Sequence, residues 1–128
     1  DLQKSVFFPG YMTTSQMVDY LSASDIYVST SIADAGLAAS TAEAMSALLP
    51  CIVTDNAENA LWIDTPKAGF LIQDKDYQAL SEKILSLASN KNMIEELGRN
   101  ARIKIEKDNN YIIEMNKMNE LYRSILRD

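Results

Sequence analysis

The chain has 128 residues, 47% of them hydrophobic, which is enough to bury the core of one ordinary domain and excludes a disordered or fibrous chain. Its formal net charge of −6 offers no basic face, so no nucleic-acid partner is expected. The sequence contains no histidine and therefore lacks the usual general base and the usual zinc ligand, so no metal site is expected either.

Short apolar runs alternate with longer helical patterns along the chain, and Asn90 is a good N-cap for the helix that follows it. The patterns predict, in chain order, a strand at 6–8, a helix at 13–22, a strand at 26–29, a small-residue loop at 30–39, a short helix to about residue 47, strands at 50–54 and 70–72, and helices at 79–89, 91–107 and 111–127.

The predicted strands are apolar throughout and are separated by helices. This pattern indicates an α/β fold, in which helices cover both faces of a parallel sheet. In such sheets, ligands bind outside the carboxyl ends of the strands. Functional residues are therefore expected just after Phe8, Val28, Thr54 and Ile72.

A single cysteine, Cys51, excludes an internal disulfide. It begins the apolar run Cys51-Ile52-Val53, which predicts a buried structural thiol rather than a nucleophile. No apolar run approaches the roughly 18 residues of a membrane span, and no signal peptide opens the sequence. A cytosolic (cytoplasmic) setting is therefore expected.

The loop after Val28 is the segment that best suits ligand chemistry. It passes Gly36 among small residues and enters a helix that contains Ser40 and Glu43. Small side chains let a ligand approach the backbone, and a helix N-terminus offers unpaired N–H groups to an anion such as a diphosphate. The spacing Ser40-x-x-Glu43 also matches a capping box, in which Glu43 only satisfies the backbone N–H of Ser40. Spacing alone does not separate these two interpretations.

An ordered set of short motifs runs through the whole chain. The motifs are Val6-x-Phe8-x-Gly10, Ala23-Ser-Asp25-Ile-Tyr-Val-Ser29, Gly36, Glu43-Ala-Met, Pro50-x-x-Val53-x-Asp55, Asn59-x-x-Trp62-Ile63, Gly69-Phe-Leu-Ile72, Leu97-Gly-x-Asn-Ala-Arg102 and Tyr122. In this order they resemble the C-terminal domain of the group 1 glycosyltransferases, which have the GT-B fold. The resemblance implies the last four strands of a partial, Rossmann-like sheet, followed by C-terminal helices.

The resemblance implies that this domain holds a nucleotide-diphosphate sugar as the donor substrate of a retaining sugar transferase, with no cofactor and usually no metal. The family signature is an acid, seven residues, and then a Glu that grips the ribose and matches Glu43. Backbone N–H groups would bind the diphosphate and the sugar, and the segment after Gly10 would border the base. The residues carried over for binding are Gly10, Tyr11, Met12, Gly36, Leu37, Ala38, Ala39, Ser40 and Glu43.

The chain departs from the family pattern at several positions. Eight residues before Glu43 stands Ala35, where the family usually has an acid; Asp34, one residue earlier, either serves instead or is an ordinary loop aspartate. Leu48 replaces a usual glycine, and would cost roughly 1 kcal/mol if that position needs a positive φ. Glu58 and Leu61 replace a usual glycine and acid. The candidate catalytic residues are Asp34 and Glu43.

Residues 1–128 are thus expected to be a partial nucleotide-sugar-binding domain, whose terminal helix, 111–128, docks on a missing acceptor domain or a companion chain. On its own, the chain is expected to be inactive. Two further candidate partners are a second copy of the chain, in a homodimer, and a membrane surface, with which the parent enzyme would associate peripherally. The alternative is a degenerate GT-B module that acts as a non-catalytic scaffold.

Overall fold

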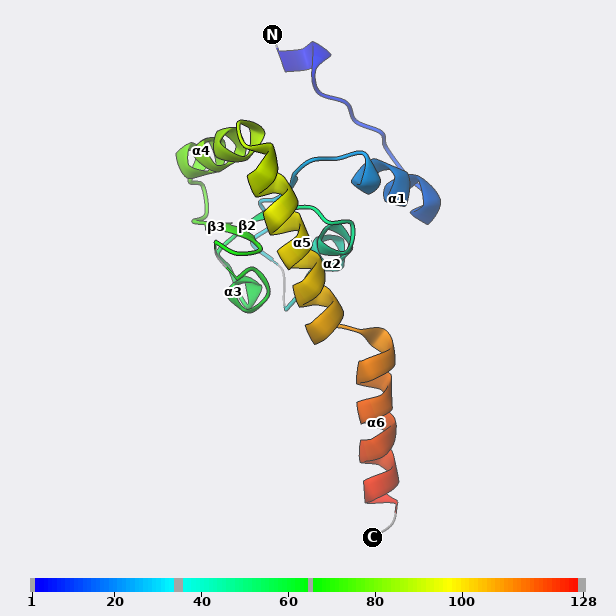
Figure 1. Cartoon of the computed structure of the whole chain (residues 1–128). Helices are drawn as coiled ribbons and strands as arrows, with labels where there is room; N and C mark the ends of the chain where they lie inside the picture. The colour runs from blue at the N-terminus through cyan, green and yellow to red at the C-terminus, as the bar shows by residue number, and fades with distance from the viewer. Residues whose placement is uncertain (1, 34–35, 65, 127–128) are drawn as a thin grey trace.

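The structure is a computed structural model that describes residues 2–33, 36–64 and 66–126 (Figure 1). Helices surround a small sheet, and the two terminal segments extend away from this body. The elements are η1 (Leu2–Lys4), α1 (Thr14–Ser22), β1 (Tyr27–Ser29), α2 (Ala39–Ser46), β2 (Cys51–Thr54), α3 (Asn59–Trp62), β3 (Gly69–Ile72), α4 (Tyr77–Ala88), α5 (Lys91–Asp108) and α6 (Tyr111–Ile125).

The sheet confirms the predicted parallel α/β architecture. Its three strands lie in the order β1-β2-β3 and all pair in parallel, with Val28 opposite Ile52 and Ile52 opposite Phe70. The central strand β2 is buried along its whole length. The carboxyl ends of all three strands therefore meet at one edge, where the loops after them gather.

The predicted strand at 6–8 is wrong. This segment lies ahead of α1 as unpaired chain, and Phe7 and Phe8 are 72% and 85% exposed. A strand exists only where a neighbouring strand completes its hydrogen bonds, and no strand of the described residues lies beside this segment. Among the described residues, its one aromatic contact is the stacking of the Phe7 ring on Tyr20 of α1, with 6.4 Å between ring centroids.

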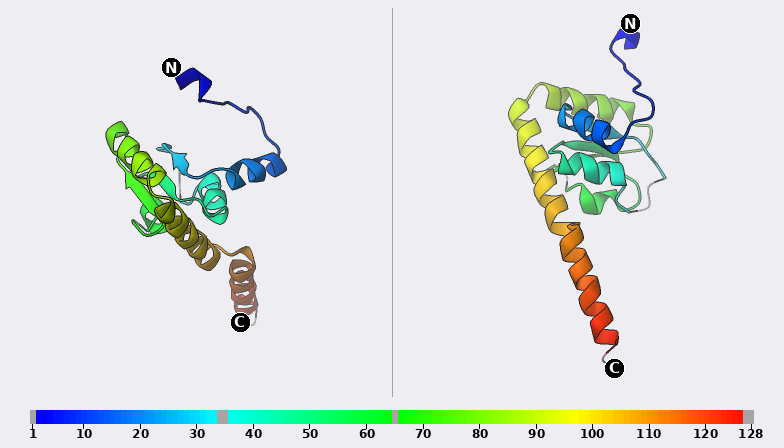
Figure 2. Two further views of the ribbon diagram at one scale, coloured as in Figure 1. Left: turned by 45° about the horizontal axis from the view of Figure 1, so that its top comes forward. Right: turned by 90° about the vertical axis from the view of Figure 1, so that its right-hand side faces the viewer.

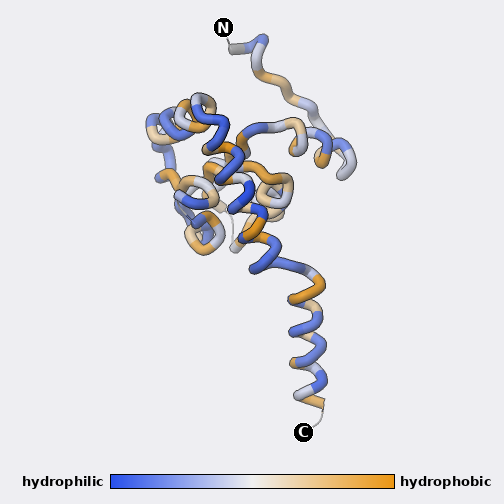
Figure 3. The backbone as a smooth tube through the Cα atoms, viewed as in Figure 1, coloured by the Kyte–Doolittle hydropathy of each residue, from blue (hydrophilic) through white to orange (hydrophobic). Residues whose placement is uncertain are grey.

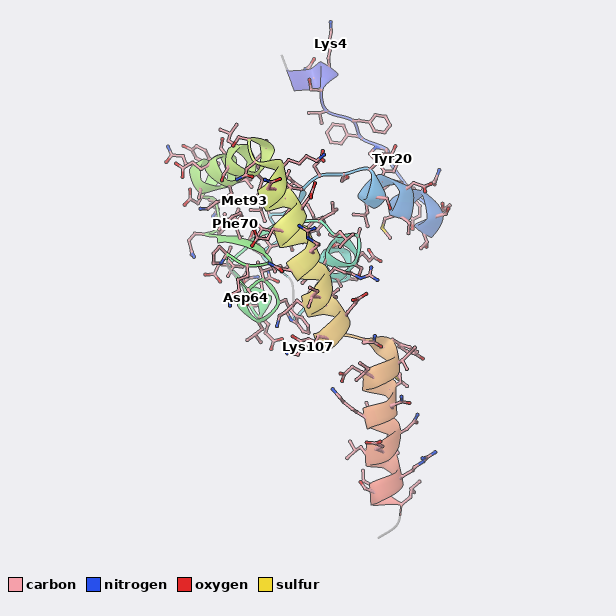
Figure 4. The ribbon with its side chains drawn as sticks, viewed as in Figure 1. Lys4, Tyr20, Asp64, Phe70, Met93 and Lys107 are labelled. Carbon is pink, nitrogen blue, oxygen red and sulfur yellow. The ribbon has the colours of Figure 1, made fainter. Side chains whose placement is uncertain are left out.

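Two apolar clusters cover the two faces of the sheet. Figure 2 shows the ribbon of the sheet and its helices from two further sides. Cys51 and Val53 point to one face, where they pack against α2 and the second half of α5. Ile52 and Phe70 point to the other face, against α4 and the first half of α5, where Met93 joins them (Figure 4). Helices on both faces were predicted from the apolar strands, and this arrangement confirms them.

The thiol of Cys51 confirms the predicted buried cysteine. The residue is completely buried, and its Sγ lies 3.5 Å from the carbonyl oxygen of Leu49. Burial removes the thiolate from water and raises the pKa of Cys51 to about 12. Such a thiol stays protonated at neutral pH and is inert as a nucleophile.

The connection from α2 to β2 turns through a left-handed residue. Leu48 has φ of +65° and packs its backbone against α5: a Cβ added to Gly98 would lie 1.9 Å from the carbonyl oxygen of Leu48. Gly98 thus allows α5 to approach the turn, and Leu48 occupies a conformation that favours glycine. The cost anticipated for Leu48 at a positive φ applies to this structure.

The predicted helices form within one or two residues of their expected ends. Asn90 caps α5 as predicted, since its side chain accepts a hydrogen bond from the N–H of Met93. The single turn α3 was not predicted. α6 buries none of its residues in the described chain and runs clear of the body, with apolar and polar positions alternating around it (Figure 3).

Across the described ranges, no helix is both long enough and apolar enough to span a lipid bilayer.

Candidate functional site

Two loops meet at the carboxyl edge of the sheet. The loop after β1 leads to α2, and the loop after β2 leads to α3. Asn56 joins them, because its side-chain amide donates to the carbonyl oxygen of Ile32 at 2.6 Å. A second amide, that of Gln73 after β3, donates to Asp55 at 3.0 Å. These two bonds hold the ends of the three strands together as one polar surface.

The N-terminus of α2 faces this edge without a side-chain cap. Its N-cap is Ala38, with extended φ and ψ of −63° and 134°, and an alanine offers no acceptor to the first N–H groups of the helix. No acidic residue stands in the first turn. This helix end thus keeps its partial positive charge and its free donors for a ligand, which suits an anion.

The capping-box interpretation of Ser40 and Glu43 is wrong. The helix begins before Ser40, so this residue lies inside the first turn rather than at the cap. Its hydroxyl instead accepts a hydrogen bond from the hydroxyl of Tyr27, at 2.8 Å, which ties α2 to β1. The carboxylate of Glu43 has no hydrogen-bond or ion-pair partner among the described residues, and it is exposed. Glu43 is therefore free to bind a ligand.

Glu43 forms part of the wall of a groove of about 390 Å³ between three helices. The groove wall is mainly apolar, with Met17, Val18 and Leu21 on the side of α1 and Ile105 on the side of α5. One turn of α2 separates Glu43 from the uncapped helix end. A ligand with an apolar ring, hydroxyl groups and an anion in series could therefore span the groove, Glu43 and the helix end.

Gly36 lies just before this helix end in a left-handed conformation, with φ of +78°. A Cβ added to it would stand 3.5 Å from the Oε2 atom of Glu58, which belongs to the facing loop. Any other side chain would be strained at this φ and would approach the carboxylate of Glu58. Gly36 therefore keeps the backbone open here, and Glu58 brings a negative charge to the site.

The segment Gly10 to Met12 does not join these residues. It precedes α1 on the extended N-terminal chain, where Gly10 has φ of +72° and open space around it and the Tyr11 side chain is fully exposed. Figure 1 shows this chain leading away from the sheet. Asp34 and Ala35 lie outside the described residues, so the choice between them as the acidic position stays a prediction.

A second hollow of about 420 Å³ lies at the same edge, on the face that α4 covers. Its floor includes Thr30, Thr54 and Ile72, which stand in one row because Thr54 pairs with Ile72 and Thr30 follows the last residue paired in β1. Thr54 is buried and polar. Functional residues were expected just after Val28, Thr54 and Ile72, and Thr30 lies in this range. Thr54 itself was not predicted, although the alternation of side chains along a strand could have indicated it.

The position of Glu58 beside Gly36 was not predicted from the sequence. It was noted only as a departure from a glycine. Its place beside Gly36 depends on how two loops, 22 residues apart along the chain, fold against each other. A one-dimensional pattern carries no signal for such a contact.

Comparison with known proteins agrees with this architecture. A family model described as "Glycosyl transferases group 1" matches residues 1–104. No curated protein matches the chain. Among solved structures, sucrose-phosphate synthase from Thermosynechococcus elongatus superposes with a TM-score of 0.90 at 23% identity, over 98% of this chain and 31% of that one, which shows the likeness of fold.

Two structures of TarM are also similar. The crystal structure of TarM gives a TM-score of 0.80 at 30% identity, over 94% of this chain and 24% of that one. A variant of S. aureus TarM, in complex with Fondaparinux, alpha-GlcNAc-glycerol and UDP, gives 0.80 at 28% identity over the same shares. This chain therefore spans less than a third of the length of each of these three structures.

Proposed function

Because the chain belongs to the group 1 glycosyl transferases, we propose that it is the part of a retaining sugar transferase that binds the nucleotide-sugar donor. The sugar would pass to a saccharide, lipid or protein acceptor. A companion domain or chain would bind that acceptor, because the similar structures are more than three times as long as this chain. Turnover is expected only when that part is present.

The uncapped N-terminus of α2, next to Gly36, is the observation that carries this proposal. A diphosphate carries two or more negative charges and needs several donors at once. The first turn of α2 supplies backbone N–H groups and the positive end of the helix dipole to the diphosphate, and the left-handed Gly36 keeps the approach to this helix end free of a side chain.

Glu43 has the chemistry to bind the ribose. A free carboxylate accepts hydrogen bonds from two neighbouring hydroxyl groups, and charge-assisted bonds of this kind are stronger than neutral ones. The groove beside Glu43 offers an apolar wall to the base. Of the two predicted catalytic residues, Glu43 therefore acts in donor binding, and the role of Asp34 remains a proposal of the family pattern.

Thermal unfolding with nucleotides tests the proposal. The chain and its Glu43→Gln variant are heated with UDP, GDP, ADP and their sugar conjugates. A ligand present at 100 times its Kd should add about 2.7 kcal/mol to the stability of the wild-type chain. The variant should lose most of this gain for one base, because the amide cannot accept both ribose hydroxyls as a carboxylate does.

Glu82→Gln is the matched control. Glu82 is an exposed glutamate of α4, so its change alters the net charge equally but lies away from the carboxyl edge. This control should retain the full stabilisation. If no nucleotide stabilises the wild-type chain, the donor-binding proposal fails and the non-catalytic scaffold becomes the better account.

A further inference from the structure

The carboxylate of Glu58 has no hydrogen-bond or ion-pair partner among the described residues, and it lies beside Gly36, just before the uncapped end of α2. We infer that Glu58 binds hydroxyl groups of the transferred sugar. It would thereby replace the acid that the resembled family usually has at the position of Ala35. This inference rests on the donor-binding function proposed above. Glu58 is assigned to the sugar half of the donor, whereas Glu43 is assigned to the ribose of the nucleotide half.

The geometry brings Glu58 to the residue that follows Ala35. The Oε2 atom of Glu58 lies 3.5 Å from the point where a Cβ of Gly36 would be. Glu58 therefore brings a carboxylate to the residue that directly follows, in the sequence, the position where the resembled family usually has an acid. Compared with the resembled family, this chain has alanine in place of an acid at position 35 and glutamate in place of glycine at position 58.

The loop that carries Glu58 is held in place on both sides. Asn56 donates to the carbonyl oxygen of Ile32 in the facing loop, at 2.6 Å. Asn59 is buried and donates to the carbonyl oxygen of Thr54 at 2.9 Å, which anchors the start of α3 to the end of β2. Ala57, between them, adopts a left-handed φ of +48°. These constraints fix the backbone from which the Glu58 side chain reaches Gly36.

Electrostatics determines which part of the donor Glu58 can meet. A carboxylate near the diphosphate would repel it, at a cost that grows as water is excluded. The same carboxylate accepts strong hydrogen bonds from neutral hydroxyl groups. A donor bound with its diphosphate at the end of α2 would therefore turn its sugar, and not its phosphates, toward Glu58. Lysine or arginine would be the expected residue if this position met the phosphates instead.

Titration calorimetry on matched ligands tests this assignment. The wild-type chain, Glu58→Gln and Asp34→Asn are each titrated with UDP and UDP-glucose, UDP and UDP-N-acetylglucosamine, GDP and GDP-mannose, and ADP and ADP-glucose. We expect Glu58→Gln to weaken the nucleotide sugar about tenfold, as for the loss of a charge-assisted hydrogen bond. The free nucleoside diphosphate should bind the variant as well as, or better than, the wild type, because a repulsive charge is gone.

Each result has a distinct meaning. Equal affinity of the wild type and Glu58→Gln for the nucleotide sugar would overturn the inference and leave the donor site standing. A loss in Asp34→Asn with none in Glu58→Gln would assign the role to Asp34 and also overturn it. If the wild type binds none of these compounds, the proposed function itself is wrong. The melting temperature of Glu58→Gln without ligand should match the wild type, because the side chain is exposed and unpaired.

Discussion

At the scale of single residues, Leu48 shows how a sequence can depart from a favourable backbone choice without losing the fold. The turn between α2 and β2 needs a positive φ, and α5 approaches this turn closely enough that Gly98 cannot carry a side chain. The Leu48 side chain itself is 52% exposed and adds little to the core. The strain at Leu48 is therefore only partly offset by its contacts.

Comparing Leu48→Gly with Leu48→Ala isolates this strain. Both changes remove the leucine side chain, but only glycine adopts a positive φ without steric cost. We expect the glycine variant to be more stable than the alanine variant by about 1 kcal/mol, the usual scale of the left-handed penalty less the entropy that glycine gains on unfolding. Urea unfolding measures both, and equal stabilities would show that the turn relaxes away from the left-handed region.

Individual residues were predictable where their role is local. Asn90 caps a helix by a bond to a residue three positions away, and Cys51 is buried because its whole strand is apolar. The capping box of Ser40 failed because tertiary contacts began the helix earlier and gave the hydroxyl to Tyr27. Glu58 was missed because its position depends on two loops meeting. Sequence spacing describes local partners, not partners supplied by another loop.

At the scale of elements, α2 lacks the side-chain N-cap that would stabilise it, so its first N–H groups stay available to a ligand. Most helices satisfy their first N–H groups with Ser, Thr, Asp or Asn at the N-cap, as Thr13 does for α1 through a full capping box with Gln16. The α2 helix has Ala38 there instead. Within the same chain, one helix thus has its first N–H groups capped by a side chain and the other does not.

Ala38→Asp should stabilise the chain and weaken its binding of a diphosphate. The new carboxylate would accept from the first N–H groups of α2 and raise the free energy of unfolding by about 1 kcal/mol. The same carboxylate would occupy the donors and repel a diphosphate, so the affinity for the nucleoside diphosphate that stabilises the wild type should fall about tenfold or more. Ala38→Asn caps without the charge and should lose less affinity. A stabilised Ala38→Asp variant with unchanged affinity would show that the diphosphate binds elsewhere.

The elements themselves followed largely from apolar periodicity. Three strands and five helices lie where the patterns predicted, because the apolar residues of each element form a run or a regular spacing within one segment of the sequence. The strand at 6–8 has the same apolar composition and yet does not form. Composition indicates that a segment can join a sheet, but its hydrogen-bonding partner decides whether it does. The single turn α3 is too short for a periodic pattern to reveal.

At the scale of the whole molecule, the chain is a body with two apolar arms. The N-terminal segment exposes Phe7 and Phe8, and its one described aromatic contact is the stacking of Phe7 on Tyr20. Helix α6 exposes large apolar residues along its length and buries none of its described residues. We expect these exposed apolar residues to contact another domain or chain, since contiguous apolar surface is typical of interaction sites. The similar structures are more than three times as long as this chain, in agreement with such a companion.

A chain that ends at Asn110 should retain the stability of the body. Because α6 buries no residue in the described chain, its removal should change the free energy of unfolding by less than about 0.5 kcal/mol, as for ordinary surface changes. A 15-residue helix without packing partners is marginal in water, so the helical circular dichroism of the full chain should fall gradually before the cooperative transition. A loss above about 1 kcal/mol on truncation would show that α6 packs on the body in solution.

The path of α5 has a consequence for how the body opens. Its first half completes the cluster on one face of the sheet, and its second half completes the cluster on the other. Detaching this single helix would wet both faces of β2 together, so neither cluster can loosen while the other stays intact. The body should therefore open as one cooperative unit. Proteases should then cleave the folded protein only in its two arms, and should reach the body only when all of it unfolds.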